Sequence, residues 1–384
     1  PNLELLSKNI NSKVVMVTGA GGSIGSEISR QIIKLNPKKL ILIELSEFAL
    51  YKISEDLKKL NQNIKIIPLL INIQNKSKID KIFKTFNIDT VYHAAAYKHV
   101  PIVEENICES IKNNVLGTFI LAEAALKYNV SNFVLVSTDK AVRSTNIMGA
   151  TKRLAEICVQ SLYNNQNQQS KFAIVRFGNV LESSGSVIPK FKQQIKEGGP
   201  VTLTHPDVTR YFMTITEASQ LVIQAGAMAE KCEVFILDMG ESVKIRDLID
   251  KMIKLSGLSI KDDQNFDGDI EIKIIGLRPG EKLYEELLLG DNPQKTYHEK
   301  IKKTQDPLIL FNKLKIDLDH LSNSIEENKV EDVKNMLSNL VPSYQSNSII
   351  VDHFYNQQFN LKNDLKLTKI INKEENKVIK IKTK

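Results

Sequence analysis

The chain has 384 residues, of which 42% are hydrophobic and 25% charged, a composition typical of a folded globular protein with more than one domain. Its net charge is +7, but residues 361–384 hold eight lysines against three acidic residues, a balance of +5 (8 − 3). The rest of the chain is nearly neutral, which argues against a nucleic-acid partner. The basic tail, residues 346–384, suits a solvated terminus better than a contact with anionic membranes.

The cysteine pattern and the apolar runs bear on the cellular compartment and on membrane association. Cys108, Cys158 and Cys232 are scattered and odd in number, which fits a reducing compartment and indicates neither a disulfide framework nor a metal site. No stretch is long and apolar enough to span a bilayer, and no signal peptide is apparent. Because the chain begins with Pro1, we expect a fragment that lacks its natural N-terminus.

The chain opens with a strand, a glycine turn and a helix. Residues 13–18 (KVVMVT) predict a buried strand, and residues 26–35 carry apolar side chains at helical spacing. Between them lie Gly19, Gly22 and Gly25, in the pattern G-x-x-G-x-x-G. Glycine lets backbone N–H groups approach a pyrophosphate at a helix N-terminus. The unit therefore predicts a dinucleotide-binding turn rather than an ordinary connection.

A second strand, residues 39–43, ends at Glu44, which lies 19 residues beyond Gly25 (44 − 25). A carboxylate at this point suits the adenosine ribose diol, although a solvated acid at a strand end fits the same pattern. No arginine follows to receive a 2′-phosphate, so the sequence favours NAD over NADP.

Further strands are predicted at residues 64–71, 90–93, 133–136, 172–177 and 233–238, the last taken as the end of the sheet, and residues 111–128 are predicted to be helical. This alternation predicts a Rossmann-type doubly wound parallel sheet in an α/β protein. Asn72 and Ile73 end the third strand, where an adenine edge would rest. After the fourth strand come three small residues, Ala94, Ala95 and Ala96, which let a cofactor lie close to the backbone. A loop follows with the polar residues Lys98, His99 and Glu104. A lone histidine is more often structural than catalytic.

The stretch at residues 136–152 (VSTDKAVRSTNIMGATK) concentrates the polar chemistry. Its hydroxyl, acidic and amine groups follow a strand, and ligands of open α/β sheets bind at the carboxyl ends of strands. A helix starting near Asn146 places Met148 and Lys152, four residues apart, on one face. This spacing matches the Tyr-x-x-x-Lys pair of short-chain dehydrogenases, with methionine in place of the phenol.

After Val180 the sequence becomes richer in proline and basic residues. We expect residues 1–180, plus about 211–240, to form the cofactor domain. Residues about 181–210 and 241–345 would form a smaller mixed α/β domain that caps the strand ends. Residues 276–282 (GLRPGEK) are predicted to open a short helix. The basic residues of this region are equally typical of a solvated face.

Taken together, these motifs resemble the nucleotide-sugar 4,6-dehydratases of the extended short-chain dehydrogenase superfamily, from about residue 12 to about residue 289. The bacterial polysaccharide-biosynthesis branch that acts on UDP-N-acetylglucosamine matches best. Related dTDP-glucose enzymes carry Asp-Glu where this chain has Asp139-Lys140, and C5-inverting members keep the tyrosine that Met148 replaces. Methionine is similar to the large membrane-anchored members, whose catalytic domain follows transmembrane helices at the cytoplasmic face of the inner membrane. A homo-oligomer is also implied.

The resemblance implies a reaction without net redox change. NAD⁺ takes hydride from C4, a base removes the C5 proton while an acid protonates the C6 hydroxyl, and the hydride returns to C6. The product would be UDP-2-acetamido-2,6-dideoxy-α-D-xylo-hexos-4-ulose, which feeds bacillosamine-type sugars for protein glycosylation. Asp139 would be the acid and Lys140 the base, which requires a lowered pKa of that amine. The acceptor of the C4 proton is left open between a water and Asp139, with Thr138 as a hydrogen-bond partner.

The resemblance also implies three sets of site residues. The catalytic set is Thr138, Asp139, Lys140, Met148 and Lys152. The cofactor set is Gly19, Gly22, Ser23, Ile24, Gly25, Glu44, Ser46, Asn72, Ile73, Ala94, Ala95, Ala96, Asn114, Ser137 and Lys152. The substrate set, for the UDP-sugar, is Lys98, Asn179, Ser186, Val187, Lys192, Arg210, Arg278 and Glu281.

Three alternatives remain. A C5-inverting dehydratase would use the same residue types. A 4-epimerase shares the fold but needs no acid–base pair at C5 and C6, and it normally relies on the missing tyrosine. An inert NAD-binding scaffold or sensor would explain the loss of tyrosine, but it would have no need of Asp139 and Lys140.

Overall fold

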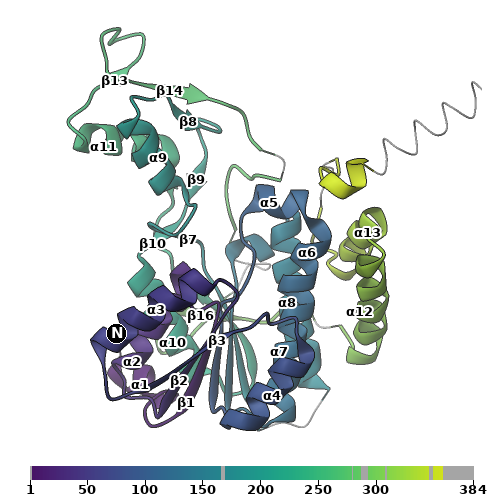
Figure 1. Cartoon of the computed structure of the whole chain (residues 1–384). Coiled ribbons are helices and arrows are strands. Elements are labelled where there is room, and N and C mark those ends of the chain that lie inside the picture. Colours follow the sequence, from purple (N-terminus) through teal and green to yellow (C-terminus); the bar gives the residue numbers. More distant parts are fainter. Residues whose placement is uncertain are drawn as a thin grey trace, which may run out of the picture.

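The computed structural model describes residues 2–165, 169–278, 280–286, 293–307, 309–345 and 349–357, so most of the basic tail predicted at residues 346–384 lies outside the described residues. Its centre is a sheet that has nine strands among the described residues (Figure 1). In spatial order they are β15 (Gln294–Lys295), β16 (Ile301–Thr304), β11 (Cys232–Leu237), β6 (Lys171–Arg176), β5 (Asn132–Val136), β4 (Thr90–His93), β1 (Val14–Thr18), β2 (Lys39–Glu44) and β3 (Lys65–Leu70).

The strands from β3 to β11 run parallel, as predicted for a Rossmann-type sheet. The order changes direction between β1 and β4, and the crevice at such a switch point binds ligands in open α/β sheets. The prediction that residues 233–238 end the sheet is wrong, because β16 pairs antiparallel with β11 and β15 pairs with β16. Only Ile301 of β16 is fully buried, so this short Lys-rich strand lacks a clear apolar pattern.

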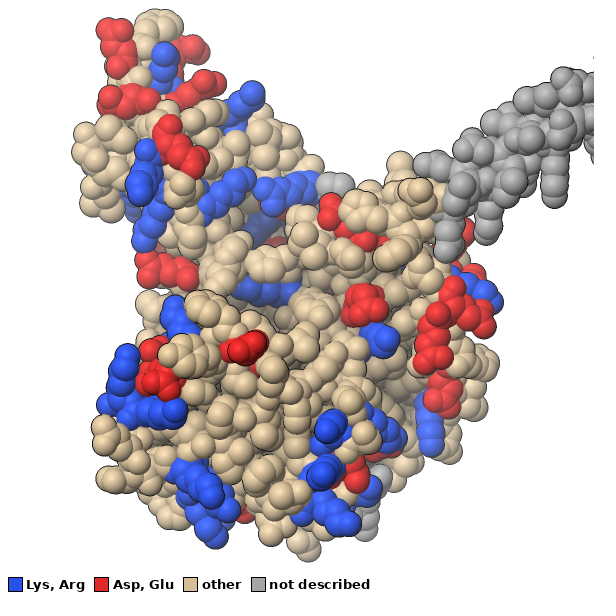
Figure 2. Space-filling view, in the orientation of Figure 1, with Lys and Arg blue, Asp and Glu red and all other residues tan. Residues whose placement is uncertain are grey.

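A smaller unit stands over the carboxyl edge of the sheet, at the upper left of Figure 1. It contains α9 (Val187–Lys196), α11 (Ile245–Leu255), β8 (Val201–Leu203), β13 (Ile260–Lys261) and β14 (Ile270–Ile274). Short strand pairs join it to the rest: β7 (Asn179–Val180) with β10 (Phe212–Met213), and β9 (Thr209–Arg210) with β12 (Val243–Lys244). Its apolar side chains form a separate small core. Figure 2 shows a hollow between the two units, with Lys and Arg side chains along it.

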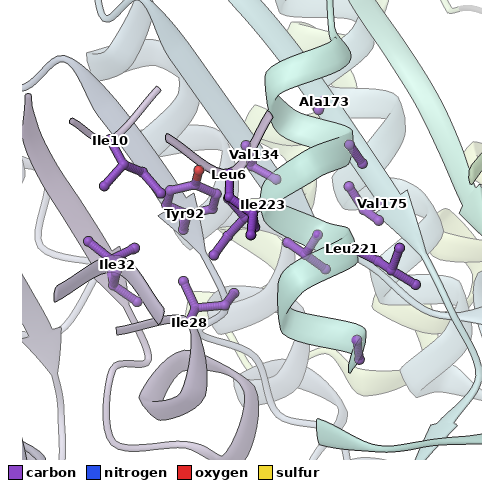
Figure 3. Close-up of a cluster of buried hydrophobic side chains, with 14 of the residues drawn as sticks. Leu6, Ile10, Ile28, Ile32, Tyr92, Val134, Ala173, Val175, Leu221 and Ile223 are labelled. Atoms are coloured by element: carbon purple, nitrogen blue, oxygen red, sulfur yellow. The ribbon is translucent and has the colours of Figure 1, made fainter. Parts of the chain in front are cut away.

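Helices cover both faces of the large sheet. One face carries α1 (Leu3–Lys8), α2 (Ser23–Ile33), α3 (Glu47–Leu60) and α10 (Ile215–Met228), and the other carries α4 (Lys76–Phe86), α7 (Gly117–Lys127) and α8 (Ile147–Asn164). In Figure 3, Ile28 and Ile32 from α2 and Leu221 from α10 meet strand residues such as Val134. Each such fully buried side chain contributes about 1.5–3 kcal/mol relative to exposure. The alternation of strands and helices thus yields the layered core expected from the sequence.

Two helices that follow β16 belong with the large sheet and not with the smaller unit. α12 (Phe311–Glu326) and α13 (Val330–Leu340) pack against α8 through a third apolar cluster. Leu314, Leu318 and Leu321 give α12 its buried stripe. The expected capping domain of residues 241–345 is therefore too long, since residues 294–304 enter the large sheet and residues 311–340 cover α8. Apolar periodicity predicts that a helix is amphipathic but does not identify its packing partner.

The segment after β4 differs in detail from the prediction. It forms α5 (Val100–Glu105) and α6 (Ile107–Ile111), and the helix predicted at residues 111–128 begins as a π-helical turn, η1 (Lys112–Leu116), before α7. Glu104, expected on a loop, lies in α5, where its buried carboxylate accepts a 2.7 Å hydrogen bond from the Ile147 N–H at the start of α8. Within the described ranges, no helix combines the length and the hydropathy needed to cross a bilayer.

Candidate active site

The glycine turn between β1 and α2 leaves no room for side chains. Gly19 has φ +64°, and a Cβ there would lie 2.7 Å from Ala95 Cα. A Cβ on Gly25 would lie 2.0 Å from the Gly19 carbonyl oxygen, so helix and strand approach closely only without side chains. Gly22 precedes the first residue of α2. The arrangement presents the backbone N–H groups of a helix N-terminus to the switch point, where a pyrophosphate is favoured.

A cavity of about 270 Å³ lies beside this turn. Its lining includes residues from the ends of β1, β2, β3 and β4: Gly19, Gly21, Gly22, Ile43, Glu44, Leu45, Ala49, Ile71, Asn72, Ile73, Ala94, Ala95, Ala96, Tyr97 and Asn113. Glu44 Oε2 accepts a 2.9 Å hydrogen bond from the Gly21 N–H, and Oε1 accepts from the N–H groups of Leu45 (2.8 Å) and Ser46 (3.1 Å). Because a carboxylate accepts about four hydrogen bonds, Glu44 keeps capacity for a ribose diol.

Two predicted cofactor residues have their side chains engaged by the protein. Ser46 does not line the cavity, and its hydroxyl accepts a 3.3 Å hydrogen bond from the Ala49 N–H at the start of α3. Asn114 bonds the backbone N–H and carbonyl of Tyr97 at 2.8 and 2.9 Å, and it donates to Thr151. It thus braces the loop after β4. Asn113 lines the cavity instead, and only the Asn-Asn pair in the sequence could have suggested it.

A second cavity, of about 470 Å³, adjoins the first and shares Gly22, Ala94 and Ala96 with it. Its lining is drawn from the glycine turn, the loop after β4, the end of β5, α8 and residues 178–186: Gly22, Ser23, Ile24, Gly25, Ala94, Ala96, Lys98, His99, Val136, Ser137, Thr138, Lys140, Met148, Lys152, Gly178, Asn179, Val180, Ser183, Ser184, Gly185 and Ser186. The two cavities together form one elongated crevice along the carboxyl edge of the sheet, as an extended dinucleotide requires.

Residues 183–186 lie against the glycine turn on one side of the second cavity. Ser23 Oγ accepts a 3.0 Å hydrogen bond from the Ser184 N–H. Gly185 has φ +67° and lies against the ring of His99, since a Cβ there would come within 2.2 Å of His99 Cε1. His99 therefore both lines the cavity and supports this loop. Ser186 Oγ is buried and has no hydrogen-bond partner among the described residues, which leaves it available to a ligand.

The predicted acid and base form a contact pair at the second cavity, where Lys140 belongs to the lining and Asp139 lies behind it. Asp139 is 1% exposed, and its Oδ1 accepts hydrogen bonds from Thr138 Oγ1 (2.8 Å) and Lys140 Nζ (3.0 Å). Lys140 Nζ also donates to Asn179 Oδ1 at 3.1 Å. The structure thus brings Thr138, Asp139 and Lys140 together beside a residue of β7. A hydrogen-bonded pair of this kind allows a proton to move within it.

The pKa of Lys140 is shifted in the direction opposite to the one that the role of base requires. Burial disfavours the ammonium form, but Asp139 and Glu285 together outweigh it, so the pKa of Lys140 is raised. The expected lowering is therefore wrong for this state of the chain. Glu285 Oε1 lies 3.8 Å from Lys140 Nζ, and no pattern in the sequence pointed to it, because the two residues are 145 positions apart (285 − 140).

Met148 and Lys152 occupy the first turns of α8 and face the second cavity. Lys152 Nζ donates a 2.7 Å hydrogen bond to the Val136 carbonyl at the end of β5. Burial lowers the pKa of Lys152 to about 8, although Glu156 acts in the opposite direction. Met148 is 4% exposed and contributes only shape and apolar surface.

Beneath the cavity lies a buried group of charges that sequence reasoning missed. It consists of Arg153, Glu156, Arg176 and Asp306, none more than 4% exposed at the side chain. Arg176 donates to both oxygens of Glu156, at 2.9 and 2.6 Å, and also contacts Asp306. Ser137 Oγ donates to Glu156 at 2.5 Å. The sequence offered one signal of this group, because Arg176 stands within the apolar strand FAIVRF.

The predicted substrate residues separate into two groups. Lys98, Asn179 and Ser186 line the second cavity, whereas Val187 and Lys192 do not, and Lys192 instead pairs with Glu182 at 2.6 Å. Farther out, Arg210 pairs with Glu281 at 3.3 Å, and Glu281 Oε2 accepts from the Arg278 N–H at 3.2 Å. Arg278 itself is exposed.

The segment around residues 276–286 is not the short helix that was predicted. The described residues 276–278 and 280–286 have no helical structure, and Pro279 lies outside the described residues. The segment reaches the large unit, because the Gly280 carbonyl accepts hydrogen bonds from Thr145 Oγ1 (2.8 Å) and Asn146 Nδ2 (3.1 Å). Gly280 in this motif thus belongs to a loop bound to the large unit and not to a helix start.

The switch-point crevice, the side-chain-free turn and the polar group on β5 and α8 define a Rossmann-type protein of the extended short-chain dehydrogenase/reductase class. The residues present fit NAD, since the turn admits a pyrophosphate and Glu44 stands where a ribose diol would lie. The chain belongs to the family described as "Polysaccharide biosynthesis protein", whose profile matches residues 15–306.

The comparisons with individual proteins agree with this family. The chain is 49% identical to the capsular polysaccharide biosynthesis protein CapD of Staphylococcus aureus, over 87% of this chain and 55% of CapD, so it spans about half the length of that relative. The solved structure of Pen from Bacillus thuringiensis is 35% identical with a TM-score of 0.66, covering 73% of this chain and 83% of Pen.

The fold alone is shared with DesIV, the dTDP-glucose 4,6-dehydratase of Streptomyces venezuelae, solved with NAD and TYD. That likeness has a TM-score of 0.62 at 19% identity, over 74% of this chain and 93% of DesIV. Solved structures of similar fold include 4-epimerases as well as 4,6-dehydratases. The prediction of NAD agrees with these neighbours.

Proposed function

We propose that this chain is the catalytic part of an NAD-dependent UDP-N-acetylglucosamine 4,6-dehydratase that retains the configuration at C5. The observation that carries the proposal is the Asp139–Lys140 pair, whose charged atoms lie 3.0 Å apart and whose lysine lines the second cavity. An elimination across C5 and C6 needs one group to remove a proton and another to supply one, and an adjacent acid and amine meet that need. An epimerase or an inert scaffold requires no such pair.

The chain's own residues provide the proton transfers. Bound NAD would supply the hydride acceptor for C4 and the donor for C6. Lys140 is an ammonium in the free chain, so it must lose its proton before it can remove one from C5. Movement of that proton to Asp139 across their hydrogen bond would create the base and the acid in a single exchange. Exclusion of water by the sugar favours the neutral pair, because burial disfavours both charged forms.

The remaining groups orient the reactants. Thr138 donates to Asp139, which fixes this hydroxyl beside the pair. Because the exchange leaves Asp139 protonated, the C4 hydroxyl proton would pass to a water. Lys152 would hold the nicotinamide ribose, as expected from its position on α8. Ser186, Asn179 and Lys98, which line the second cavity, would bind the sugar nucleotide there. Arg210, Arg278 and Lys192, which lie outside this lining, would bind its charged portion. Arginine suits a diphosphate because its planar fork makes paired, charge-assisted hydrogen bonds.

We also infer the setting from the family and from the resemblance. The product would feed bacillosamine-type sugars, and the chain would act as a homo-oligomer within a longer protein attached to the cytoplasmic face of the inner membrane. Support comes from the 49% identity to CapD, a longer protein of which the match covers 55%. Fractionation of cells that express the full-length gene product tests the membrane attachment, and light scattering of this chain tests the oligomer.

The experiment that tests the reaction is incubation with UDP-N-acetylglucosamine in heavy water, followed by NMR of the product. We expect a 6-deoxy-4-keto sugar with deuterium at C5 and gluco-like stereochemistry. The opposite C5 configuration would identify an inverting dehydratase. Epimerisation at C4 without loss of the C6 hydroxyl would identify an epimerase. Retention of NAD with no turnover of this or other UDP-sugars would favour the inert scaffold.

A further inference from the structure

Glu285 is a buried carboxylate that the reaction outlined above does not use. Its side chain is 6% exposed, and it lies in the segment of residues 280–286 that extends from the smaller unit. The same oxygen, Oε1, lies 3.8 Å from Lys140 Nζ and 3.8 Å from Arg210 Nε. One carboxylate oxygen therefore stands between a cation of the reaction centre and a cation of the expected diphosphate site.

The segment that carries Glu285 is fixed to both units. Its Gly280 carbonyl is bonded by Thr145 and Asn146 of the large unit, and Lys282 Nζ donates to the Val142 carbonyl at 3.3 Å. On the side of the smaller unit, the Thr209 N–H donates to the Leu283 carbonyl at 3.0 Å. Glu285 is therefore held in place by backbone contacts on both sides and is not a mobile surface side chain.

Lys140 is surrounded by charges from several elements. Asp139 faces it from its own turn, Glu285 from the segment of residues 280–286, Arg210 from β9, and Lys98 from the loop after β4. The two carboxylates favour the ammonium form, and the two cations oppose it. Without Glu285, a single carboxylate would face two cations and a buried site, so the ammonium would lose much of its support.

We propose that Glu285 is a positioning residue that holds Lys140 as an ammonium in the free enzyme and links it to Arg210. This inference deepens the proposed function and rests on it for the role of Lys140. A diphosphate bound at Arg210 would offset the positive charge that opposes the ammonium form, so Glu285 and the diphosphate together would keep the proton on Lys140 against loss to solvent. The proton would then leave through the hydrogen bond to Asp139, which is the exchange that forms the acid and the base.

Amine labelling of the free chain tests the electrostatic part without any substrate. Reductive methylation, followed by mass spectrometry of the Lys140 peptide, reports the fraction of neutral amine at each pH. In Glu285→Gln we expect the labelling profile of Lys140 to move to lower pH by about one unit, because a carboxylate within about 4–6 Å favours the charged form. Glu286→Gln is the matched control, since Glu286 is the adjacent, exposed carboxylate that pairs with Arg143 at 3.1 Å.

The conservative variant separates charge from structure. Glu285→Asp keeps a carboxylate but sets it one methylene farther from Lys140 Nζ, so its Lys140 profile should move to lower pH, though by less than that of Glu285→Gln. Identical profiles in wild type and Glu285→Gln would overturn the proposal, as would equal shifts in the Gln and Asp variants. Circular dichroism of each variant identifies loss of fold; if Glu285→Gln unfolds, the Glu285→Asp profile alone decides, and a value equal to that of Glu286→Gln overturns the proposal.

Kinetics test whether the interaction persists during turnover. The pH profile of kcat/KM reports the free enzyme, and that of kcat reports the substrate complex. In Glu285→Gln the acid limbs of both profiles should move to lower pH, because the carboxylate faces Lys140 with or without substrate. An unmoved kcat/KM limb would contradict the proposal. Absence of the 4-keto product in the wild type would refute the proposed function instead and leave the labelling result standing.

Discussion

Ser137 donates a 2.5 Å hydrogen bond to Glu156, so a residue that lines the second cavity is tied directly to a fully buried carboxylate. Through Glu156 the contact continues to Arg176 in β6 and to Asp306 beyond β16. The end of β5, where the polar residues of the site begin, is thus held by a segment far along the chain. A change in the buried charges should affect both stability and the geometry of the cavity.

Removal of the Glu156 charge should destabilise the fold strongly. Glu156→Gln leaves Arg153 and Arg176 with one carboxylate between them in a buried site, and breaking such a pair costs about 3–5 kcal/mol. Glu123→Gln is the control, because Glu123 pairs with Lys76 at the surface and should cost at most about 1 kcal/mol. Urea unfolding measures both. Equal, small losses would show that the buried group contributes little.

Lys152 should make stability depend on pH in the alkaline range. Its pKa is about 8 in the fold against 10.5 ordinarily, so between these values the unfolded chain binds more protons. The contribution of Lys152 to the free energy of unfolding therefore rises with pH from about 8 to 10.5. Below about 8 the folded chain holds a buried ammonium, which lowers its stability. The difference in unfolding free energy between wild type and Lys152→Met, measured from pH 7 to 10, should change in favour of wild type as pH rises.

The same variant should separate stability from activity. At pH 7, Lys152→Met removes a buried charge and should be no less stable than wild type, whereas turnover should fall at least about 100-fold if this amine orients the cofactor ribose. A large loss of stability at pH 7 would contradict the burial argument. Retained turnover would contradict the role of Lys152.

Met148 should be replaceable by leucine. Met148 is 4% exposed and has no titratable group, so its contribution is to fill space beside the cavity. Met148→Leu conserves volume and should cost less than about 1.5 kcal/mol of stability, with turnover within about threefold of wild type. A loss of more than about tenfold would indicate that the thioether has a specific role. Thermal unfolding and initial rates measure the two effects.

Gly19→Ala should weaken cofactor binding for two separable reasons. The added Cβ would meet the backbone of Ala95 at 2.7 Å, and φ +64° disfavours a side chain by about 1–3 kcal/mol. Gly257→Ala has a similar φ of +74° but meets nothing within 4 Å, so it isolates the backbone term. We expect weaker NAD binding by calorimetry only for Gly19→Ala. Equal binding by both variants would show that the close approach to Ala95 is unimportant.

The parallel part of the sheet was predictable because its signals are local. Short apolar runs, glycine at Gly19 and Gly25, and the acid Glu44 each lie within a few residues of the structure that they determine. The polar group at residues 137–140 was predictable for the same reason, since the end of a buried strand fixes where it lies.

Contacts between distant segments were not predictable. Arg176 and Asp306 are 130 residues apart, and nothing near either residue identifies the other. The raised pKa of Lys140 depends on Glu285, so the charge of the expected base was assigned in the wrong direction. β16 was missed because a four-residue strand with two lysines has too little pattern to distinguish it from a loop.

The burial of α8 limits how copies of this chain can associate. Every residue from Ile147 to Leu162 is buried, because α7 and η1 lie on one side of the helix and α12 and α13 on the other. The helix that carries Met148 and Lys152 therefore offers no free face to a second subunit. A homo-oligomer of this chain must therefore form through other surfaces. A change at the subunit contacts would affect Lys152 only indirectly, through the helices that cover α8.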